Sequence, residues 1–279
     1  MTWALGTPTM WGYAAGIADI RVSFPDGSTL DCLQKIYPVG RFIAAAFSGS
    51  VRLGFWAIED LTKHLEVPVA YADASWKPGW VVFKWWRRVR RAFAQASAED
   101  RTLGLEILLL GVSAVADLGI PWFPRPTVAV LRSPDFVPEI VQINDIAAIG
   151  SGAGVNYYMS RVREVMRPDA GMILNIQIGI DGRLASVLTH LAHRSVAEHP
   201  TDSVSPYVHL CLVRRGEVRI TNSDHQTAFS DGRRVEVRMP PVATSWAQFE
   251  AMCRGRGVSA PAASATRRSQ YRSASSSTL

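Results

Sequence analysis

Cysteine is scarce in this sequence: the 279 residues include three, Cys32, Cys211 and Cys253. An odd number at such wide spacing provides neither a disulfide framework nor a zinc motif, so we expect a reducing compartment. Long hydrophobic runs are absent as well, because the longest, at residues 107–116, is too short to cross a membrane. The first residues carry neither the basic region nor the apolar core of a secretory signal peptide. These absences together predict a soluble cytoplasmic protein.

The patterns that hold metals and cofactors are also missing. His190 and His193 lie three residues apart on an expected helix, but no glutamate of a zinc motif stands beside them. The glycines at 150–154 lack the full spacing of a dinucleotide fingerprint and the residue order of a nucleophile elbow. We therefore expect no metal and no organic cofactor.

Positive charge is unevenly distributed along the chain. The formal net charge is +6, and arginines stand at positions 254, 256, 267, 268 and 272, in or just before a segment rich in serine and alanine. Such a composition cannot bury enough apolar surface to offset the entropy lost on ordering. We predict a folded domain at residues 1–256 and a disordered tail at 257–279. Without the tail the charge approaches neutrality, so the basic composition does not favour nucleic acid as a partner.

Hydrophobic periodicity predicts a mixed α+β domain. Alternating or continuous apolar runs predict strands, and apolar residues at helical spacing predict helices. The expected strands are residues 3–7, 12–24, 42–47, 106–114, 127–131, 139–143, 146–149, 207–213 and 217–221, with an extended insertion at 172–180. The expected helices are residues 53–65, 80–98, 151–166, 184–198 and 244–253. Two strand groups with two helix pairs are typical of sheets packed face to face with helices outside.

Candidate chemistry begins at Thr2, directly behind Met1. If Met1 is removed, Thr2 carries a hydroxyl nucleophile and a free α-amine, so the nucleophile brings its own base. An α-amine has an ordinary pKa of about 7.7–8.0, and a buried lysine beside it lowers that pKa by charge repulsion. Lys35 is the candidate lysine, and Asp19 is the carboxylate that would hold it in place.

Four sequence blocks share their order and spacing with a known family. They are the opening segment that ends Ala-Asp-Ile-Arg, the segment from Lys35 to Ser48-Gly-Ser, the Gly-Ser-Gly that follows Asp145, and Thr201-Asp-Ser-Val-Ser before the expected strand at 207–213. Together they resemble the proteasome β-subunit superfamily of N-terminal-nucleophile hydrolases, including its bacterial relatives. The resemblance runs from Thr2 to about Arg219.

The resemblance implies a four-layer αββα sandwich and a threonine-type peptidase. The catalytic residues that it implies are Thr2, Asp19, Lys35, Gly49, Ser151, Asp202 and Ser205. Thr2 would be the nucleophile, Lys35 would set the electrostatics, the N–H of Gly49 would bind the oxyanion, and the last three residues would position the amine. Phe47 would form the floor of a specificity pocket for small or medium apolar side chains. The resemblance also implies peptide or protein substrates, a homo-oligomeric ring or stack and an ATP-dependent unfoldase as a possible partner, with no nucleic acid, membrane, metal or cofactor.

Two departures from the family pattern leave other functions open. The interval from Thr2 to Asp19 is one residue longer than usual, and Pro8 falls within the expected first strand. Because proline cannot donate to a sheet ladder, we expect a bulge or a wider hairpin there. Pro206 stands where the family generally has glycine. An amidase acting on a small metabolite, and a catalytically silent ring-forming or interaction protein, are the alternatives to a peptidase.

The candidate residues also have structural interpretations. Asp19 could pair with nearby Arg21 at the surface, and Lys35 could be an ordinary edge-strand lysine. Gly49 could serve a turn that needs a positive φ, and Ser151 could be a helix N-cap. Each residue alone favours the structural interpretation, and only their joint spacing favours catalysis.

A basic segment competes with the peptidase interpretation. In Phe83-Lys-Trp-Trp-Arg-Arg-Val-Arg-Arg-Ala-Phe, an expected helix carries Lys84, Arg87, Arg88 and Arg91 on one side. A basic amphipathic helix of this kind can bind a membrane or a nucleic acid. We favour a helix that packs on the core and exposes its basic face. Contact with a neighbouring subunit is a further alternative, since tryptophan and arginine are enriched in interface anchors.

Overall fold

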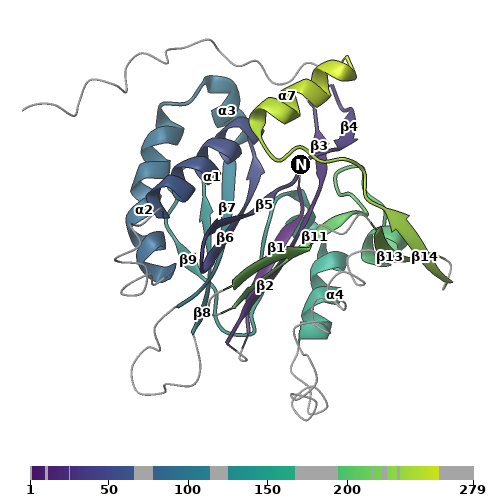
Figure 1. Ribbon diagram of the computed structural model, residues 1–279, viewed down its shortest axis with the longest axis horizontal. Helices are drawn as coiled ribbons and strands as arrows, with labels where there is room; N and C mark the ends of the chain where they lie inside the picture. The colour runs from purple at the N-terminus through teal and green to yellow at the C-terminus, as the bar shows by residue number, and fades with distance from the viewer. Residues whose placement is uncertain are drawn as a thin grey trace, which may run out of the picture.

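Two antiparallel sheets of five strands each form the centre of the protein (Figure 1). A computed structural model describes residues 2–9, 12–24, 26–65, 78–113, 125–166, 194–214, 217–221, 225–230 and 233–257. The strand order is β10-β1-β2-β11-β12 in the first sheet and β5-β6-β7-β8-β9 in the second. The predicted α+β class is thereby confirmed.

The first sheet consists of β1 (Ala4–Pro8), β2 (Ala14–Asp19), β10 (Ala147–Ile149), β11 (Val208–Arg214) and β12 (Glu217–Thr221). The second consists of β5 (Ile36–Gly40), β6 (Ile43–Gly49), β7 (Leu105–Val112), β8 (Pro126–Arg132) and β9 (Glu139–Ile140). Two small ribbons pair β3 (Arg21–Ser23) with β4 (Thr29–Asp31), and β13 (His225–Ser230) with β14 (Arg233–Arg238). The helices are α1 (Val51–Leu65), α2 (Pro78–Ala94), α3 (Ala98–Leu103), α4 (Asn156–Met166) and α7 (Trp246–Gly255), with a 3₁₀ turn, η2 (Ser151–Gly154).

Small side chains fill much of the layer between the two sheets. The buried cluster there includes Ala4, Ala14, Ala18, Ala44 and Ala46 together with larger residues of β7, β8 and β11. Side chains alternate between the two faces of a strand. Leu108 and Leu110 of β7 accordingly lie between the sheets, whereas Ile107 and Leu109 belong to an outer cluster.

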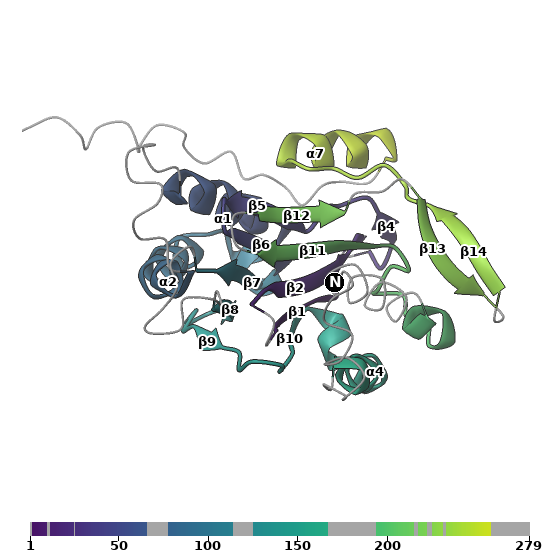
Figure 2. The same ribbon diagram turned by 60° about the horizontal axis from the view of Figure 1, so that its bottom comes forward.

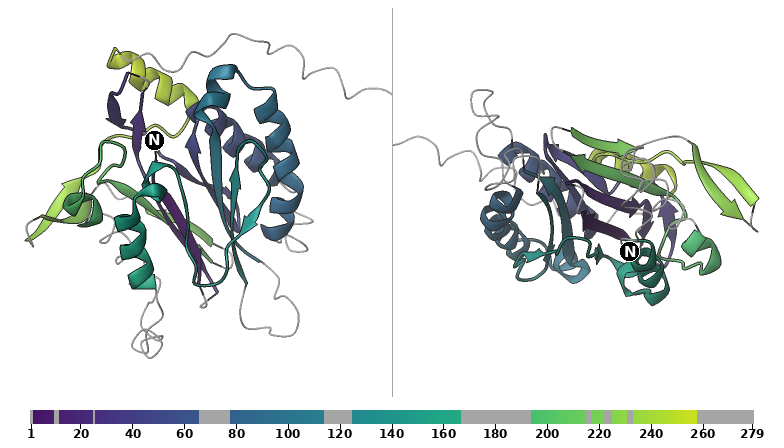
Figure 3. Two further views of the ribbon diagram at one scale, coloured as in Figure 1. Left: turned by 180° about the vertical axis from the view of Figure 1, so that it is seen from behind. Right: turned by 90° about the horizontal axis from the view of Figure 1, so that it is seen from below.

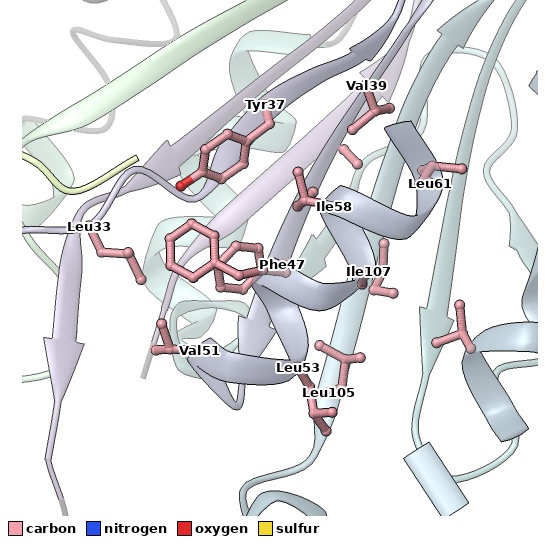
Figure 4. Close-up of a cluster of buried hydrophobic side chains, with 14 of the residues drawn as sticks. Leu33, Tyr37, Val39, Phe47, Val51, Leu53, Ile58, Leu61, Leu105 and Ile107 are labelled. Carbon is pink, nitrogen blue, oxygen red and sulfur yellow. The ribbon is translucent and has the colours of Figure 1, made fainter. Parts of the chain in front are cut away.

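Helices pack on the outer faces of both sheets. α1 and α2 lie on one side of the paired sheets and α4 on the other (Figures 1 and 3). Apolar residues of α1 such as Leu53, Ile58 and Leu61 cover the second sheet (Figure 4). Tyr158 and Val162 of α4 cover the first sheet. The N-terminus of α1 is capped by Ser50, whose Oγ accepts the N–H of Leu53 at 3.2 Å.

The hairpin between β1 and β2 is regular up to its loop. β1 and β2 pair without a register shift from Ala4 opposite Ala18 to Pro8 opposite Ala14. The N–H of Thr9 donates to the carbonyl of Tyr13 at 2.9 Å and closes a wide loop. The wider hairpin is thus correct and the bulge is wrong. About 20 Å of strand separates this loop from Thr2, at about 3.3 Å per residue.

The basic helix packs on the core, as favoured. α2 buries Trp85 and Val89 against the second sheet, while Phe83 is 60% exposed and Trp86 only partly buried. The basic residues therefore share the outer surface with Phe83. The expected helix at 80–98 ends at Ala94, and α3 follows as a separate helix capped by Ser97.

Several expected elements differ from the structure. The strand at 12–24 is divided at Ile20 into β2 and β3, and the strand at 139–143 is limited to Glu139–Ile140. The helix at 151–166 begins as η2 and becomes α-helical from Asn156. β4, β5 and the β13–β14 ribbon, which lies at the periphery in Figure 2, were not predicted. The extended segment at 172–180, most of the helix at 184–198 and the tail after 257 lie outside the described residues, although 194–198 is helical.

Candidate active site

The buried carboxylate of Asp19 accepts three hydrogen bonds, one from the Lys35 side chain and two from backbone N–H groups. Its Oδ1 accepts the Lys35 Nζ at 2.7 Å and the N–H of Trp3 at 3.0 Å. Its Oδ2 accepts the N–H of Ser205 at 3.0 Å. Asp19 is fully buried at the end of β2, and Lys35 is 1% exposed. The predicted Lys35–Asp19 pair is therefore present, and the alternative surface pair of Asp19 with Arg21 is wrong.

Lys35 lies in an environment that opposes its charge. Burial lowers the pKa of its ammonium group, and the Asp19 carboxylate partly counteracts this effect. Nζ also donates to the carbonyl of Arg21, at the start of β3. The edge-strand interpretation fails here, because a solvated edge lysine is not enclosed in this way.

Thr2 is held through its backbone by the turn at the start of η2. The Thr2 carbonyl accepts the N–H of Gly152 at 3.1 Å and the Oγ of Ser151 at 3.4 Å. Gly150 has φ 81°, and a Cβ on it would lie 2.1 Å from the Thr2 carbonyl oxygen. Ser151 thus contacts Thr2, and the N-cap interpretation is wrong because Gly150 occupies the cap position of η2. Thr2 itself is 4% exposed.

Gly49 ends β6 at the strand-to-helix turn before α1. Its φ of 93° disfavours any side chain, and a Cβ on it would lie 2.4 Å from the Gly104 carbonyl oxygen. The residue is exposed, whereas Ser48 and Ser50 on either side are buried. Ser48 Oγ lies 2.9 Å from the position of a Gly150 Cβ, which places the end of β6 beside the turn that holds Thr2. The oxyanion role of Gly49 stays a prediction.

The loop at 201–205 brings the backbone of Ser205 to the Asp19 carboxylate. Ser205 is fully buried, and its Oγ accepts the N–H of Tyr207 at 3.1 Å, which continues the chain past Pro206 into β11. Asp202 is exposed, and its charge acts on Arg21. The role predicted for Asp202 at the Thr2 amine stays a prediction.

Arg21 organises this loop. Its guanidinium pairs with Asp31 through Nε at 2.8 Å and Nη2 at 3.0 Å, and Nη1 donates to the Val204 carbonyl at 3.0 Å. The hydrogen bond and charge of Asp31 raise the pKa of Arg21. Arg21 therefore fixes the segment that delivers the Ser205 N–H to Asp19.

Phe47 lies in the core beneath α1. It is 1% exposed and lies beside Tyr37 (Figure 4). The ring centroids of Tyr37 and Phe55 lie 6.2 and 5.7 Å from that of Phe47. Gly54 of α1 lets the helix approach this ring, since a Cβ there would lie 2.2 Å from Phe47. The ring is therefore a fixed packing element two residues before Gly49, and its role as a pocket floor stays a prediction.

Neither a scan against models of protein families nor a search of curated proteins finds a match for this chain. Within the described ranges no cluster of histidine, cysteine, aspartate or glutamate is arranged to hold a metal ion. The same part of the chain contains no helix that is long and apolar enough to cross a membrane.

Two further polar residues border this site and were not among the candidates. His209 of β11 is 2% exposed, and its Nδ1 has no hydrogen-bond partner among the described residues. Burial, aided by the charge of Lys35, lowers the pKa of His209 to about 4. Glu106 of β7 accepts the N–H of Gly150 at 2.6 Å. In the sequence, each of the two is a lone polar residue between apolar neighbours, and this was the signal available for both.

Proposed function

We propose that this chain is a proteasome-like threonine peptidase with an N-terminal-nucleophile mechanism. The observation that carries the proposal is the buried Asp19 carboxylate, which binds Lys35 and the backbone N–H of the residue directly after Thr2. A charged pair removed from water is costly unless its hydrogen bonds are satisfied. Perturbed, buried charges gather at functional sites, and an N-terminal nucleophile needs a charge near its amine.

The chemistry follows from Thr2 once Met1 is removed. Its Oγ1 attacks the carbonyl carbon of a peptide bond while the α-amine, directly or through a water molecule, takes the hydroxyl proton. The tetrahedral intermediate then expels the leaving amine, which receives that proton, and an ester on Thr2 results. A water molecule hydrolyses the ester and restores the hydroxyl group. The N–H of Gly49 is the proposed donor to the oxyanion.

Lys35 acts on the base rather than on the substrate. A positive charge close to the α-amine disfavours the ammonium form, so it lowers the pKa of the amine and increases the neutral fraction at physiological pH. Asp19 keeps Lys35 in place and, through the N–H of Trp3, ties its position to the chain at residue 3. Ser151 and Ser205 complete the setting by their contacts with Thr2 and Asp19.

The packing supports a four-layer αββα arrangement of the N-terminal-nucleophile hydrolase type. Separate hydrophobic clusters lie between the two sheets and beneath the helices on each outer face. We further propose peptide or protein substrates and a homo-oligomeric assembly that encloses the nucleophiles. Exposed apolar side chains support assembly, among them Phe83 on α2 and Val137, Ile140 and Ile143 around the edge strand β9.

Hydrolysis of a panel of fluorogenic peptides tests the proposed activity. We expect cleavage by the purified protein, loss of cleavage in Thr2→Ala, and residual cleavage in Thr2→Ser, which keeps a hydroxyl and an α-amine on one residue. A panel of small acylamides tests the metabolite amidase. Cleavage of acylamides without peptides would replace the peptidase by that amidase, and unchanged peptide cleavage in Thr2→Ala would reject the N-terminal nucleophile.

A further inference from the structure

Ser48, Glu106 and Arg132 lie in one row across neighbouring strands of the second sheet. Ser48 of β6 and Arg132 of β8 are the ladder partners of Glu106 in β7. Alternation along the strands places all three on the face toward the first sheet, since Leu108 and Val130 lie between the sheets two residues away. The row therefore forms a polar end to the layer between the sheets.

The two carboxylate oxygens of Glu106 bind different groups, a side chain and a backbone N–H. Its Oε1 accepts the Arg132 Nε at 3.1 Å, and its Oε2 accepts the N–H of Gly150 at 2.6 Å. Arg132 is fixed in turn, because Nη1 donates to Glu139 at 2.7 Å and Nη2 to the carbonyl of Ala148 at 3.1 Å. A hydrogen bond to an ionised acceptor is stronger than one between neutral groups. Glu106 thus ties Gly150, at the end of β10, to the second sheet.

Gly150 lies in close contact with the backbone of Thr2. The close approach of Gly150 to the Thr2 carbonyl leaves no room for a Cβ, and the N–H of Gly152 binds the same carbonyl at 3.1 Å. In the other direction, β7 pairs with β6 so that Leu105, next to Glu106, lies opposite Gly49. Glu106 is therefore connected both to the backbone of the proposed nucleophile and to the strand end that carries the proposed oxyanion donor.

We propose that Glu106 is a positioning residue that sets the distance between Thr2 and Gly49. This role rests on the proposed function, because it concerns the attack by Thr2 and the oxyanion that forms beside Gly49. Glu106 acts through the backbone of Gly150. A displacement of about 1 Å in such a pair can lower a rate about 100-fold, even when the substituted residue does not contact the substrate.

Inactivation by a peptide epoxyketone is the kinetic test. For Glu106→Ala we expect the maximal inactivation rate to fall about 10- to 100-fold while the half-saturating probe concentration changes less than about 3-fold, since positioning affects the chemical step. Glu106→Gln keeps an oxygen for the Gly150 N–H and should recover part of the rate. Glu139→Gln is the matched control, because it removes the exposed partner of the same arginine and should leave the rate unchanged.

Hydrogen exchange measured on the same variants is independent of activity. We expect faster exchange in peptides covering residues 2–9 and 147–152 in Glu106→Ala than in Glu139→Gln, with the rest of the protein unchanged. Equal exchange in the two variants, or a wild-type inactivation rate in a folded Glu106→Ala, would overturn the positioning role alone. A wild-type protein that never reacts at Thr2 would reject the proposed function and the positioning role with it. If Glu106→Ala does not fold, Glu106→Gln decides by the same two measurements.

Discussion

Replacement of Asp19 by asparagine should destabilise the protein in a pH-dependent manner. The variant keeps the shape of the side chain but removes the carboxylate that pairs with Lys35, which is 1% exposed. Removal of one partner of a buried ion pair typically costs about 3–5 kcal/mol. Lys35 can limit that cost by losing its proton, which from an unfolded pKa of 10.5 requires about 5 kcal/mol at pH 7, at about 1.4 kcal/mol per unit.

The sign of the pH dependence follows from the pKa of Lys35. Burial already lowers this pKa in the folded protein, and loss of Asp19 lowers it further. The unfolded variant then binds more protons than the folded variant, so its stability rises with pH. We expect a deficit of about 3–5 kcal/mol at pH 7 that shrinks by about 1.4 kcal/mol for each pH unit up to pH 9.

Urea denaturation of wild type and Asp19→Asn at pH 7, 8 and 9 measures this difference, at one protein concentration so that assembly contributes equally. Asp31→Asn is the matched control, because Asp31 pairs with Arg21 at side-chain exposures of 18% and 19%. Its deficit should be smaller and constant over this range. A deficit below about 1 kcal/mol for Asp19→Asn at pH 7, or one that does not change with pH, would refute the reasoning.

Three further predictions concern His209, the glycines of η2 and the exposed face of α2. Between pH 7.5 and pH 5 the wild type should lose about 2 kcal/mol more stability than His209→Leu, since His209 has a pKa of about 4 when folded and 6.5 when unfolded. Urea denaturation of both proteins at the two pH values measures these losses, and equal losses would contradict the prediction. Gly150→Ala should abolish reaction with an epoxyketone, because its φ is 81° and its Cβ would meet the Thr2 carbonyl, whereas Gly154→Ala, with open space around it, should react normally. Reaction rates of the two alanine variants decide the point. Phe83→Glu should lower the particle mass measured by light scattering at micromolar concentration, because Phe83 is an exposed apolar residue of α2. Arg91→Ala, at another exposed position of α2, is the control and should leave the mass unchanged. A monomeric wild type would reject the enclosed assembly.

Periodicity was sufficient where one element carries one clear pattern. α1 follows the helical spacing of Leu53, Ile58 and Leu61, and β7 follows a continuous apolar run. The pattern failed where the geometry of the backbone determines the bounds of an element. Residues 12–24 read as one strand, yet Ile20 separates two strands of different sheets, and the hydrophobic pattern alone does not mark such a change of sheet. The β13–β14 ribbon mixes polar residues with Phe229, Val235 and Val237 in two short segments, and it was not predicted.

The sequence indicated one pair of the candidate site but not the backbone contacts around it. The spacing identified the Lys35–Asp19 pair, and the structure brings the two together. It could not reveal that Asp19 also binds the N–H of Trp3 or that Ser151 binds the Thr2 carbonyl, because both contacts join segments that are distant in the sequence and that only the fold brings together. Glu106 stands out as the one charged residue of an apolar strand, but its hydrogen bond to the Gly150 N–H joins residues that are far apart in the sequence and could not be inferred from it.

The central claim, that Thr2 is the nucleophile, is tested most directly by the mass of the protein after treatment with a peptide epoxyketone. Such a probe needs a hydroxyl group and an amine on one residue. We predict that purified wild type lacks Met1, gains the mass of one probe molecule per chain, and carries it on Thr2 in the N-terminal peptide. Retention of Met1 on every chain, an unmodified protein, or a probe located on any other residue would contradict the account.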